Sequence, residues 1–410
     1  MQRLFWKEGT EKNWLIPISI LLIGCLHTLI FAIFQIPGNF LFALTGDQIA
    51  IYAKSIFYGC AILTSLFHQI VCRYLGLRKS LQIGLFFNLL GLCVLLYHHF
   101  TKGNTPEILL WIDMVFFGIS LTSVINALVT YAILKFPKRT GPAITLLFAV
   151  FNAGVLLAPI MLNFFHRHGG DRYAYFVLIL GMILSMIFVH FCFSDPHFPR
   201  HLDSLRKGSL IWKELHYRLV LFLIAIIFYG LVETTFSLWG LEQIGQILNA
   251  YRANNTISLL WLFMIVGQLI LLFPLYVYPA KRIFYALVLL VITAAWTFPM
   301  QHTLVGFAAC LILAGLGCSA MFPILLSMME KEFLRLTDIH HLLPFVETGT
   351  SVMIAGYFLG IGLIDLSLEL RFAIPISSYF HLAALLMSFT GMIALYLNLT
   401  VDKSHPHSRY

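Results

Sequence analysis

The chain has 410 residues, of which 60% are hydrophobic and 11% are charged, and its mean hydropathy is +0.88. A soluble globular chain has about 25% charged and 45–50% apolar residues, so water cannot be the solvent for most of this surface. The net charge of +8 would suit an anionic partner such as nucleic acid. The Lys and Arg residues, however, fall in short loops between apolar segments, so the positive charge is explained by membrane topology. Nucleic-acid binding therefore loses its main support.

Twelve segments are long and apolar enough to cross a bilayer, which takes about 20 residues. In chain order they lie near 14–36, 49–72, 80–99, 107–134, 141–164, 173–194, 217–239, 256–278, 283–300, 303–329, 342–366 and 376–400. The sequence therefore predicts an all-α, multi-pass integral membrane protein of twelve transmembrane helices, in a plasma membrane or a bacterial inner membrane.

The basic residues are divided unequally between the two sides of such a protein. Counting the loops alternately from the amino terminus places 20 Lys and Arg on one side and 6 on the other. Cytoplasmic loops of membrane proteins collect Lys and Arg. We therefore expect both termini in the cytoplasm.

A long polar connection in the middle of the chain separates two sets of six spans. It predicts an N-terminal six-helix bundle (1–195), a cytoplasmic linker (196–216) and a C-terminal six-helix bundle (217–410). Each half repeats the same features: a basic turn, YLGLRK and VYPAKR, and a glycine-rich fifth helix, FNAGVLLAPI and IAGYFLGIG. One large class of transporters is built from parallel six-helix repeats, with the substrate site near the midplane between them. The repeat indicates two pseudo-symmetric bundles around a central site.

The loop after the second span carries the strongest local motif. Its sequence QIVCRYLGLRK (69–79) resembles the G-x-L-a-D-r-x-G-r-k signature of the major facilitator superfamily. Gly76, Arg78 and Lys79 match the basic half of the signature, whereas Arg73 stands about where the family has Asp. The resemblance implies the major facilitator fold and makes these four residues gating candidates. It also implies that the family's acidic latch is altered here or supplied by another residue.

Two further stretches narrow the resemblance. IFYGLVETTFSLW (227–239) and GLGCSAMFPILLSMM (315–329) are similar to the fucose permease-like branch of proton-coupled sugar carriers. Sugar-transporting members tend to carry acids in the first and fourth helices, but the first span here offers only His27, and the comparable part of the fourth reads SLTSVINALVT. The resemblance thus implies proton-coupled transport without implying a sugar.

Ionisable residues inside the spans are coupling candidates, because a charge at membrane depth costs at least about 2.5–3.5 kcal/mol. Glu233 is the first candidate, since a carboxylic acid in a low-dielectric cavity can exchange a proton near neutral pH; the alternative is a structural hydrogen bond between the halves. Asp113 is either a coupling acid or a residue that reaches the outer interface or pairs with Lys54 as a static gate. His27 titrates in the physiological range, or is simply hydrogen-bonded in the core.

Other polar and aromatic residues are candidates for gating or for contact with the solute. Glu347, near the inner end of the eleventh span, could pair at an inner gate with Arg78, Lys79, Arg139 or Arg335. Asn126, Asn152 and Trp239 could touch a substrate, or could instead bridge helices and pack. The seven cysteines lie in apolar runs without ligand spacing, so we expect no metal and no cofactor.

These features predict a secondary active transporter that moves a small polar solute by alternating access, coupled to protons or another cation. One alternative is a proton-driven efflux antiporter for drug-like or metal-chelating, siderophore-like molecules, and another is a non-transporting membrane sensor. The sequence contains no HExxH, GxSxG or Walker A motif, so we expect no enzyme. The expected partners are the solute, the coupling cation and the lipid bilayer, and the protein is expected to be a monomer.

Overall fold

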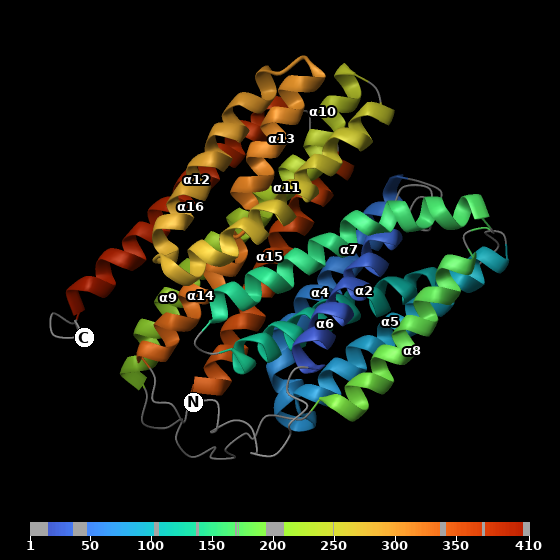
Figure 1. The fold of residues 1–410 in the computed structure, drawn as a ribbon, viewed down its shortest axis with the longest axis horizontal. Coiled ribbons are helices and arrows are strands. Elements are labelled where there is room, and N and C mark those ends of the chain that lie inside the picture. The colour runs from blue at the N-terminus through green and yellow to red at the C-terminus, as the bar shows by residue number, and fades with distance from the viewer. Residues whose placement is uncertain are drawn as a thin grey trace.

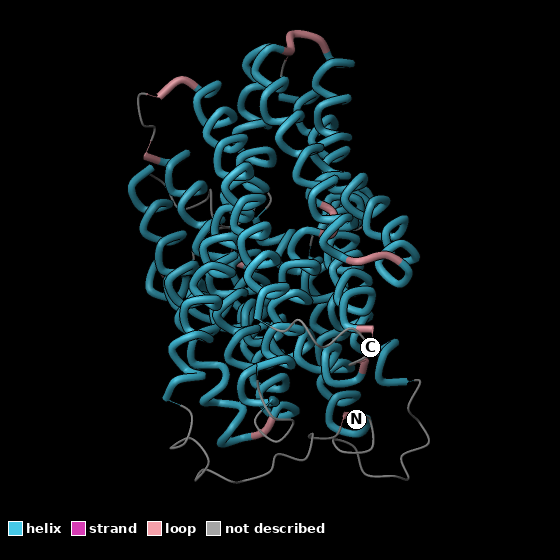
Figure 2. The backbone as a smooth tube through the Cα atoms, turned by 90° about the vertical axis from the view of Figure 1, so that its left-hand side faces the viewer, coloured by secondary structure: helices cyan, strands magenta, loops and turns pink. Residues whose placement is uncertain are grey.

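The computed structural model describes residues 15–35, 47–101, 106–136, 139–168, 170, 172–193, 209–248, 250–336, 342–370 and 374–404. Within these ranges the chain is helical and forms no strand, as the uniformly helical tube in Figure 2 shows. The described residues contain 12 helices long and apolar enough to cross a membrane. The predicted all-α class and the predicted twelve spans are confirmed.

Six helices make up the N-terminal half, and the remaining spans make up the C-terminal half. The first six are α2 (Leu15–Gln35), α4 (Asp47–Leu75), α5 (Leu77–Phe100), α6 (Glu107–Lys135), α7 (Thr140–His168) and α8 (Arg172–Cys192). The second set is α9 (Ser209–Thr234) with η2 (Thr235–Trp239) and α10 (Gly240–Ile247), α11 (Ala250–Val277), α12 (Ala280–Thr297) with η3 (Phe298–Met300), α13 (Leu304–Cys318) with α14 (Met321–Leu336), α15 (Leu342–Glu369) and α16 (Ile376–Ser404).

Two spans are less regular than their sequences predict. The seventh, expected over 217–239, is α9, a five-residue π-helical turn and α10 in succession, and the tenth, expected over 303–329, is divided between α13 and α14. The helix α9 begins at Ser209, so the last part of the predicted linker 196–216 is helical, and residues 196–208 lie outside the described part of the chain. A helix can continue into polar sequence beyond the lipid, where hydropathy no longer reports it.

The halves form two bundles that meet along two seams. In Figure 1, α2, α5 and α8 lie together in the N-terminal bundle, and α12, α13 and α16 lie together in the C-terminal bundle. Between the bundles, α4 packs against α15 and α7 packs against α11. We call the side where α8 ends and α9 begins the linker side, and the opposite side, where α10 lies, the far side.

Glycines allow equivalent helices in the two halves to cross at backbone contact. A Cβ atom on Gly154 would lie 2.4 Å from the backbone of α2, and one on Gly360 would lie 2.4 Å from the backbone of α9. Likewise, a Cβ on Gly118 would lie 2.5 Å from α4, and one on Gly315 would lie 2.6 Å from α11. The fifth helix thus crosses the first as the eleventh crosses the seventh, and the fourth crosses the second as the tenth crosses the eighth. These matched crossings are the structural form of the predicted pseudo-symmetry.

The turn between α4 and α5 depends on a single glycine. Gly76 alone separates the two helices and has φ 89° and ψ 158°. This backbone conformation strains any residue with a Cβ atom, so glycine is required there. The glycine of the signature loop therefore reverses the chain between two long helices.

Candidate solute and proton site

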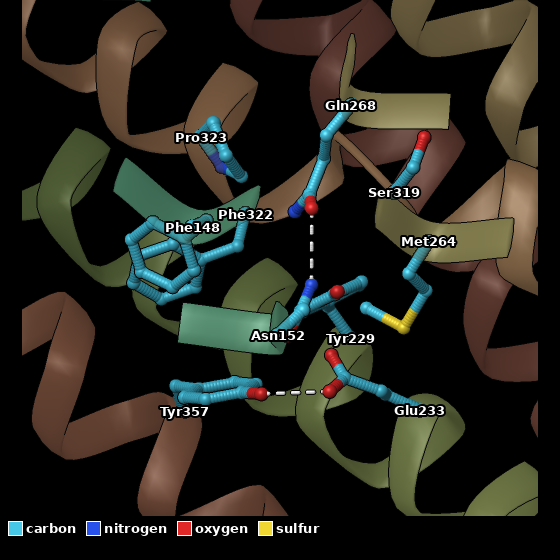
Figure 3. A pocket seen from close by; sticks show the side chains of 10 residues that line it. All are labelled: Phe148, Asn152, Tyr229, Glu233, Met264, Gln268, Ser319, Phe322, Pro323 and Tyr357. Carbon is cyan, nitrogen blue, oxygen red and sulfur yellow. Dashed lines mark hydrogen bonds between the residues drawn. The ribbon is translucent and has the colours of Figure 1, made fainter. Parts of the chain in front are cut away.

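A small cavity lies between the two halves, with α7 on one side and α9, α11, α14 and α15 on the other (Figure 3). Its volume is about 10 Å³, about the space that one water molecule needs. Its lining residues are Phe148, Asn152, Tyr229, Glu233, Met264, Gln268, Ser319, Phe322, Pro323 and Tyr357. The cavity is therefore small in this arrangement, with polar groups at its centre.

Two of the spans that line the cavity depart from regular α-helix beside it. Pro323 lies in the first turn of α14, and a proline ring clashes with the carbonyl group four residues earlier, which belongs to Ser319. The helix accordingly breaks at Ser319 and Ala320. In the seventh span the π turn begins at Thr235, two residues after Glu233. Such irregular turns are frequent at functional sites in helices.

Glu233 is buried in the cavity wall with half of its carboxyl group unpaired. Its side chain is 4% exposed, and its Oε1 atom accepts a hydrogen bond of 2.8 Å from the hydroxyl of Tyr357 (Figure 3). Its Oε2 atom is buried and has no hydrogen-bond partner. Among the described residues no Lys or Arg forms an ion pair with it. A carboxyl group in this setting can take up or release a proton without breaking a salt bridge.

Two tyrosines hold the surroundings of Glu233 in place. Tyr229, one turn earlier on α9, donates its hydroxyl to the carbonyl oxygen of Cys318 at 3.0 Å. That carbonyl lies at the end of α13, where a helix leaves acceptors without intrahelical partners. The rings of Tyr229 and Tyr357 stack with centroids 5.8 Å apart. The break in the tenth span and the acid of the seventh are thus connected by aromatic side chains.

An amide pair joins the two halves across the cavity. Asn152 Nδ2 on α7 donates to Gln268 Oε1 on α11 at 3.1 Å, and the side chains are 8% and 1% exposed (Figure 3). This pair places Asn152, a predicted substrate candidate, in the cavity lining. Because an amide carries both donors and acceptors, each residue keeps further hydrogen-bonding groups for a solute that separates the pair.

The remaining sequence candidates in the N-terminal half lie away from the cavity lining. His27 is fully buried, with Nδ1 2.8 Å from Asn88 Nδ2 and Nε2 3.3 Å from the Leu121 carbonyl oxygen. These contacts suit a neutral, hydrogen-bonded imidazole, which was one of its two predicted roles. Asn126 donates to Ser65 Oγ at 2.8 Å and to the carbonyl oxygen of Thr122 on its own helix, also at 2.8 Å.

Asp113 is fully buried, and neither of its carboxyl oxygens has a hydrogen-bond partner. It therefore does not reach the outer interface, and the predicted pairing with Lys54 is wrong in this structure. Lys54 Nζ instead donates to Oδ1 of Asp365 at 2.8 Å, and the hydroxyl of Tyr58 donates to Oδ2 at 3.0 Å. We call Lys54, Tyr58 and Asp365 the far-side clasp, because it joins α4 of one half to α15 of the other.

Sequence reasoning missed Asp365, although its signal was present as a single acid in the apolar run GIGLIDLSL. Trp239, predicted as a possible ligand contact, instead stacks on Tyr379 of α16 with centroids 4.1 Å apart, outside the cavity lining. The side chain of Glu347 lies outside the described part of the structure, so its pairing at a gate stays a prediction. Among the described residues, no group of three or more His, Cys, Asp and Glu could hold a metal ion.

A family model described as Major Facilitator Superfamily matches residues 16–364. The chain belongs to the major facilitator superfamily. It is therefore an integral, multi-pass membrane transporter, and the predicted resemblance is confirmed. No curated protein matches the chain by sequence.

The fold of this major facilitator protein is shared with solved structures of a bacterial carrier. The chain is similar to a crystal structure of the E. coli fucose:proton symporter FucP, with a TM-score of 0.72 and 13% identity over 94% of this chain and 98% of that one. It is also similar to a structure of the major facilitator transporter FucP in the outward conformation, with a TM-score of 0.75, 14% identity and the same coverage. These similarities confirm the predicted major facilitator fold.

The signature loop of this major facilitator protein lies between α4 and α5, on the linker side. Arg73 and Lys79 are exposed, and Arg78 donates to the carbonyl oxygen of His190 on α8, within its own half. On the linker side, the start of α7 contacts the other half. Thr140 donates to Glu330 Oε1 on α14 at 3.1 Å. Glu330 is a second acid that sequence reasoning missed.

Proposed function

We propose that this major facilitator protein is a proton-coupled secondary transporter that takes up a small, uncharged, polar solute by alternating access. Glu233 is the acid that carries the proton. The observation that supports this role is its buried carboxyl group, which has one oxygen bonded to Tyr357 and the other unpaired. An ionised carboxylate without a counter-charge is costly in an apolar site, so we infer that the closed form holds Glu233 in its neutral, protonated state.

Coupling to the solute would follow from the amide pair beside this acid. A solute that bonds to Asn152 and Gln268 replaces a contact between the halves, so binding changes how strongly the halves hold together. When the cavity opens to either side, water reaches Glu233 and its proton can exchange. Solute and proton would therefore cross in the same closed form, which is what symport requires.

The cavity lining also limits the charge of the solute. No Lys or Arg is among the lining residues, so a carboxylate or phosphate would meet no counter-charge. Phe148 and Phe322 lie with ring centroids 4.6 Å apart and offer apolar faces beside the amides. A neutral molecule with several hydroxyl or amide groups and one apolar face fits this chemistry best.

The apolar part of this lining supports a second candidate, the proton-driven efflux antiporter for drug-like or siderophore-like molecules. Phe148, Met264, Phe322 and Pro323 would pack against a larger apolar solute. Symport and antiport differ in the direction of solute movement relative to the proton gradient, so one assay separates them.

We further propose that the linker side faces the cytoplasm, with both termini there. We also propose that residues 1–195 and 217–410 form the two bundles and that residues 196–216 connect them. The excess of Lys and Arg on that side supports this orientation. A reporter that is fluorescent only in the cytoplasm, fused to the carboxyl end, should be bright. A reporter active only outside the membrane should be silent there, and the opposite pair of results would reverse the orientation.

The function is tested by uptake into proteoliposomes under an imposed pH gradient, with panels of sugars, organic acids and iron chelators. We expect the native protein to accumulate one neutral solute toward the alkaline side while protons enter with it. Glu233→Gln should lose gradient-driven accumulation but keep exchange of labelled for unlabelled solute, because the neutral amide can no longer deliver a proton. Glu242→Gln, an exposed acid on α10, is the matched control and should behave as the native protein.

Three outcomes bear on the proposal. Unchanged accumulation by Glu233→Gln would show that this carboxyl does not couple transport to protons. Movement of the solute against the direction of proton entry would establish the antiporter. Accumulation only of carboxylates or phosphates would contradict the inference drawn from the lining.

A further inference from the structure

On the linker side, the two halves meet at the start of α7 as well as along the seam of α4 with α15. In the signature loop, Arg73 stands where the family has an acid, and Arg78 bonds within its own half. The halves nevertheless meet closely on this side. A Cβ atom on Gly141 would lie 3.4 Å from Ser327 Oγ and 3.9 Å from Ser327 Cβ, which are contacts between α7 and α14.

An acid lies at the centre of this contact. Glu330 is 2% exposed, and its Oε1 atom accepts the hydroxyl of Thr140, which is 5% exposed, at 3.1 Å. Its Oε2 atom is buried and unpaired. Thr140 is the first residue of α7, so the carboxyl group lies against a helix start, where free N–H groups and the helix dipole favour negative charge.

A cation and an aromatic ring close the contact beside this acid. The guanidinium of Arg139 lies over the ring of Tyr276 with Cζ 4.9 Å from the centroid, and its Nη2 is 3.4 Å from the tyrosine hydroxyl. Tyr276 lies near the end of α11, in the C-terminal half. Consecutive residues at the start of α7 therefore contact two different helices of the other half.

We propose that Glu330, docked on the start of α7, is the acidic latch of the linker-side gate, and that Arg139 and Tyr276 complete that gate. This acid lies in the contact between the fifth and tenth spans, not in the loop between the second and third. This inference rests on the proposed alternating access, in which α7 and α14 must separate at this end when the linker side opens. Opening breaks the Thr140–Glu330 bond and exposes the carboxyl group to water.

A disulfide between Gly141→Cys and Ser327→Cys reports on this gate directly. The Cβ separation of 3.9 Å lies within the 3.5–4.5 Å that a disulfide needs. A protease site is placed between the halves, so that after cleavage the cross-link keeps the two fragments together on a non-reducing gel. The chain with only its native cysteines measures the background cross-linking. The rate of cross-linking measures how often the gate is closed, and it needs neither solute nor gradient.

We expect Glu330→Ala to slow this cross-linking by up to about tenfold, the effect of losing one buried hydrogen bond. Thr140→Val should act in the same direction, and Glu330→Gln, whose amide oxygen can still accept the Thr140 hydroxyl, should be affected less. The matched control is Glu332→Gln, two residues further on, whose ion-pair partner Arg218 belongs to the same half. It should leave the rate unchanged.

The proposal would be overturned if Glu330→Ala and Thr140→Val cross-linked at the same rate as the Gly141→Cys/Ser327→Cys variant alone. It would also be overturned if Glu332→Gln slowed cross-linking as much as Glu330→Ala. Thermal unfolding in detergent identifies a variant that fails to fold, and Thr140→Val then decides the result. Because the measurement uses no transport, a positive result stands even if Glu233 proves not to carry the proton. Conversely, a failure here leaves the coupling experiment intact.

Discussion

We expect the crossing of α9 and α15 at Gly360 to position the hydrogen bond between Tyr357 and Glu233. In Gly360→Ala the new Cβ would lie 2.4 Å from the carbonyl oxygen of Ile227 and 2.9 Å from the backbone nitrogen of Leu231. Both are backbone atoms of a helix, so neither can rotate away. Restoring ordinary contact at 3.4 Å from 2.4 Å requires the two helices to separate by about 1 Å at this level.

This displacement is large compared with the bond that it disturbs. Tyr357 lies less than one turn before Gly360 on the same helix, and its hydroxyl is 2.8 Å from Glu233 Oε1. A separation of about 1 Å would lengthen that contact toward 3.8 Å, beyond the reach of a hydrogen bond. We expect the overpacking to destabilise the fold by about 1–3 kcal/mol and the lost bond to reduce gradient-driven uptake by about tenfold.

The assay pairs thermal unfolding in detergent with initial uptake rates in proteoliposomes. Gly59→Ala on α4 is the matched control, because a Cβ atom there would meet nothing within 4 Å. The control should unfold and transport as the native protein does. If Gly360→Ala matched the control in both measurements, the inference that a rigid backbone contact positions Tyr357 against Glu233 would be refuted.

Two further predictions concern contacts between the halves. In the far-side clasp, the side chains of Lys54 and Asp365 are 14% and 11% exposed. Lys54→Met should therefore leave Asp365 as a poorly solvated charge and destabilise the protein by about 3 kcal/mol. It should also make the far side more accessible to thiol reagents. The double variant Lys54→Met/Asp365→Asn should recover most of that stability, and a double variant no more stable than the single one would contradict the pairing. Asn152→Ala should raise the solute concentration for half-maximal uptake by about two- to tenfold through the loss of one hydrogen bond, with Gln268→Ala acting in the same direction. A change in maximal rate alone, measured over a range of solute concentrations, would show that the amides do not bind the solute.

The spans could be predicted from the sequence because hydropathy measures the contact of each helix with lipid. Glu233 could be found for the same reason, since an acid in an apolar run stands out from its neighbours. Its partner could not be found, because Tyr357 lies 124 residues away and nothing local marks which of the 17 tyrosines will face it. The seams between helices, and not the helices themselves, determine the site.

Residues near the ends of spans were harder to interpret. Asp365 and Glu330 lie where a span meets the membrane surface, and hydropathy tolerates charge there. Their importance follows from the partners that tertiary packing brings to them, Lys54 and Thr140. The π turn was equally hidden, because TFSLW is as compatible with an ordinary α-helix as with a wide turn.

The π turn at Thr235–Trp239 sets how far one end of the seventh span is rotated about the helix axis relative to the other end. A π turn holds one residue more than an α turn, and each residue of an α-helix advances about 100° around the axis. Deleting one residue here would therefore swing the far end by about that angle, taking Trp239 off Tyr379 while leaving Glu233 beside Tyr357. The extra residue therefore lets one span direct Glu233 toward the cavity and Trp239 toward Tyr379 of α16. A regular α-helix of the same sequence could not combine these two directions.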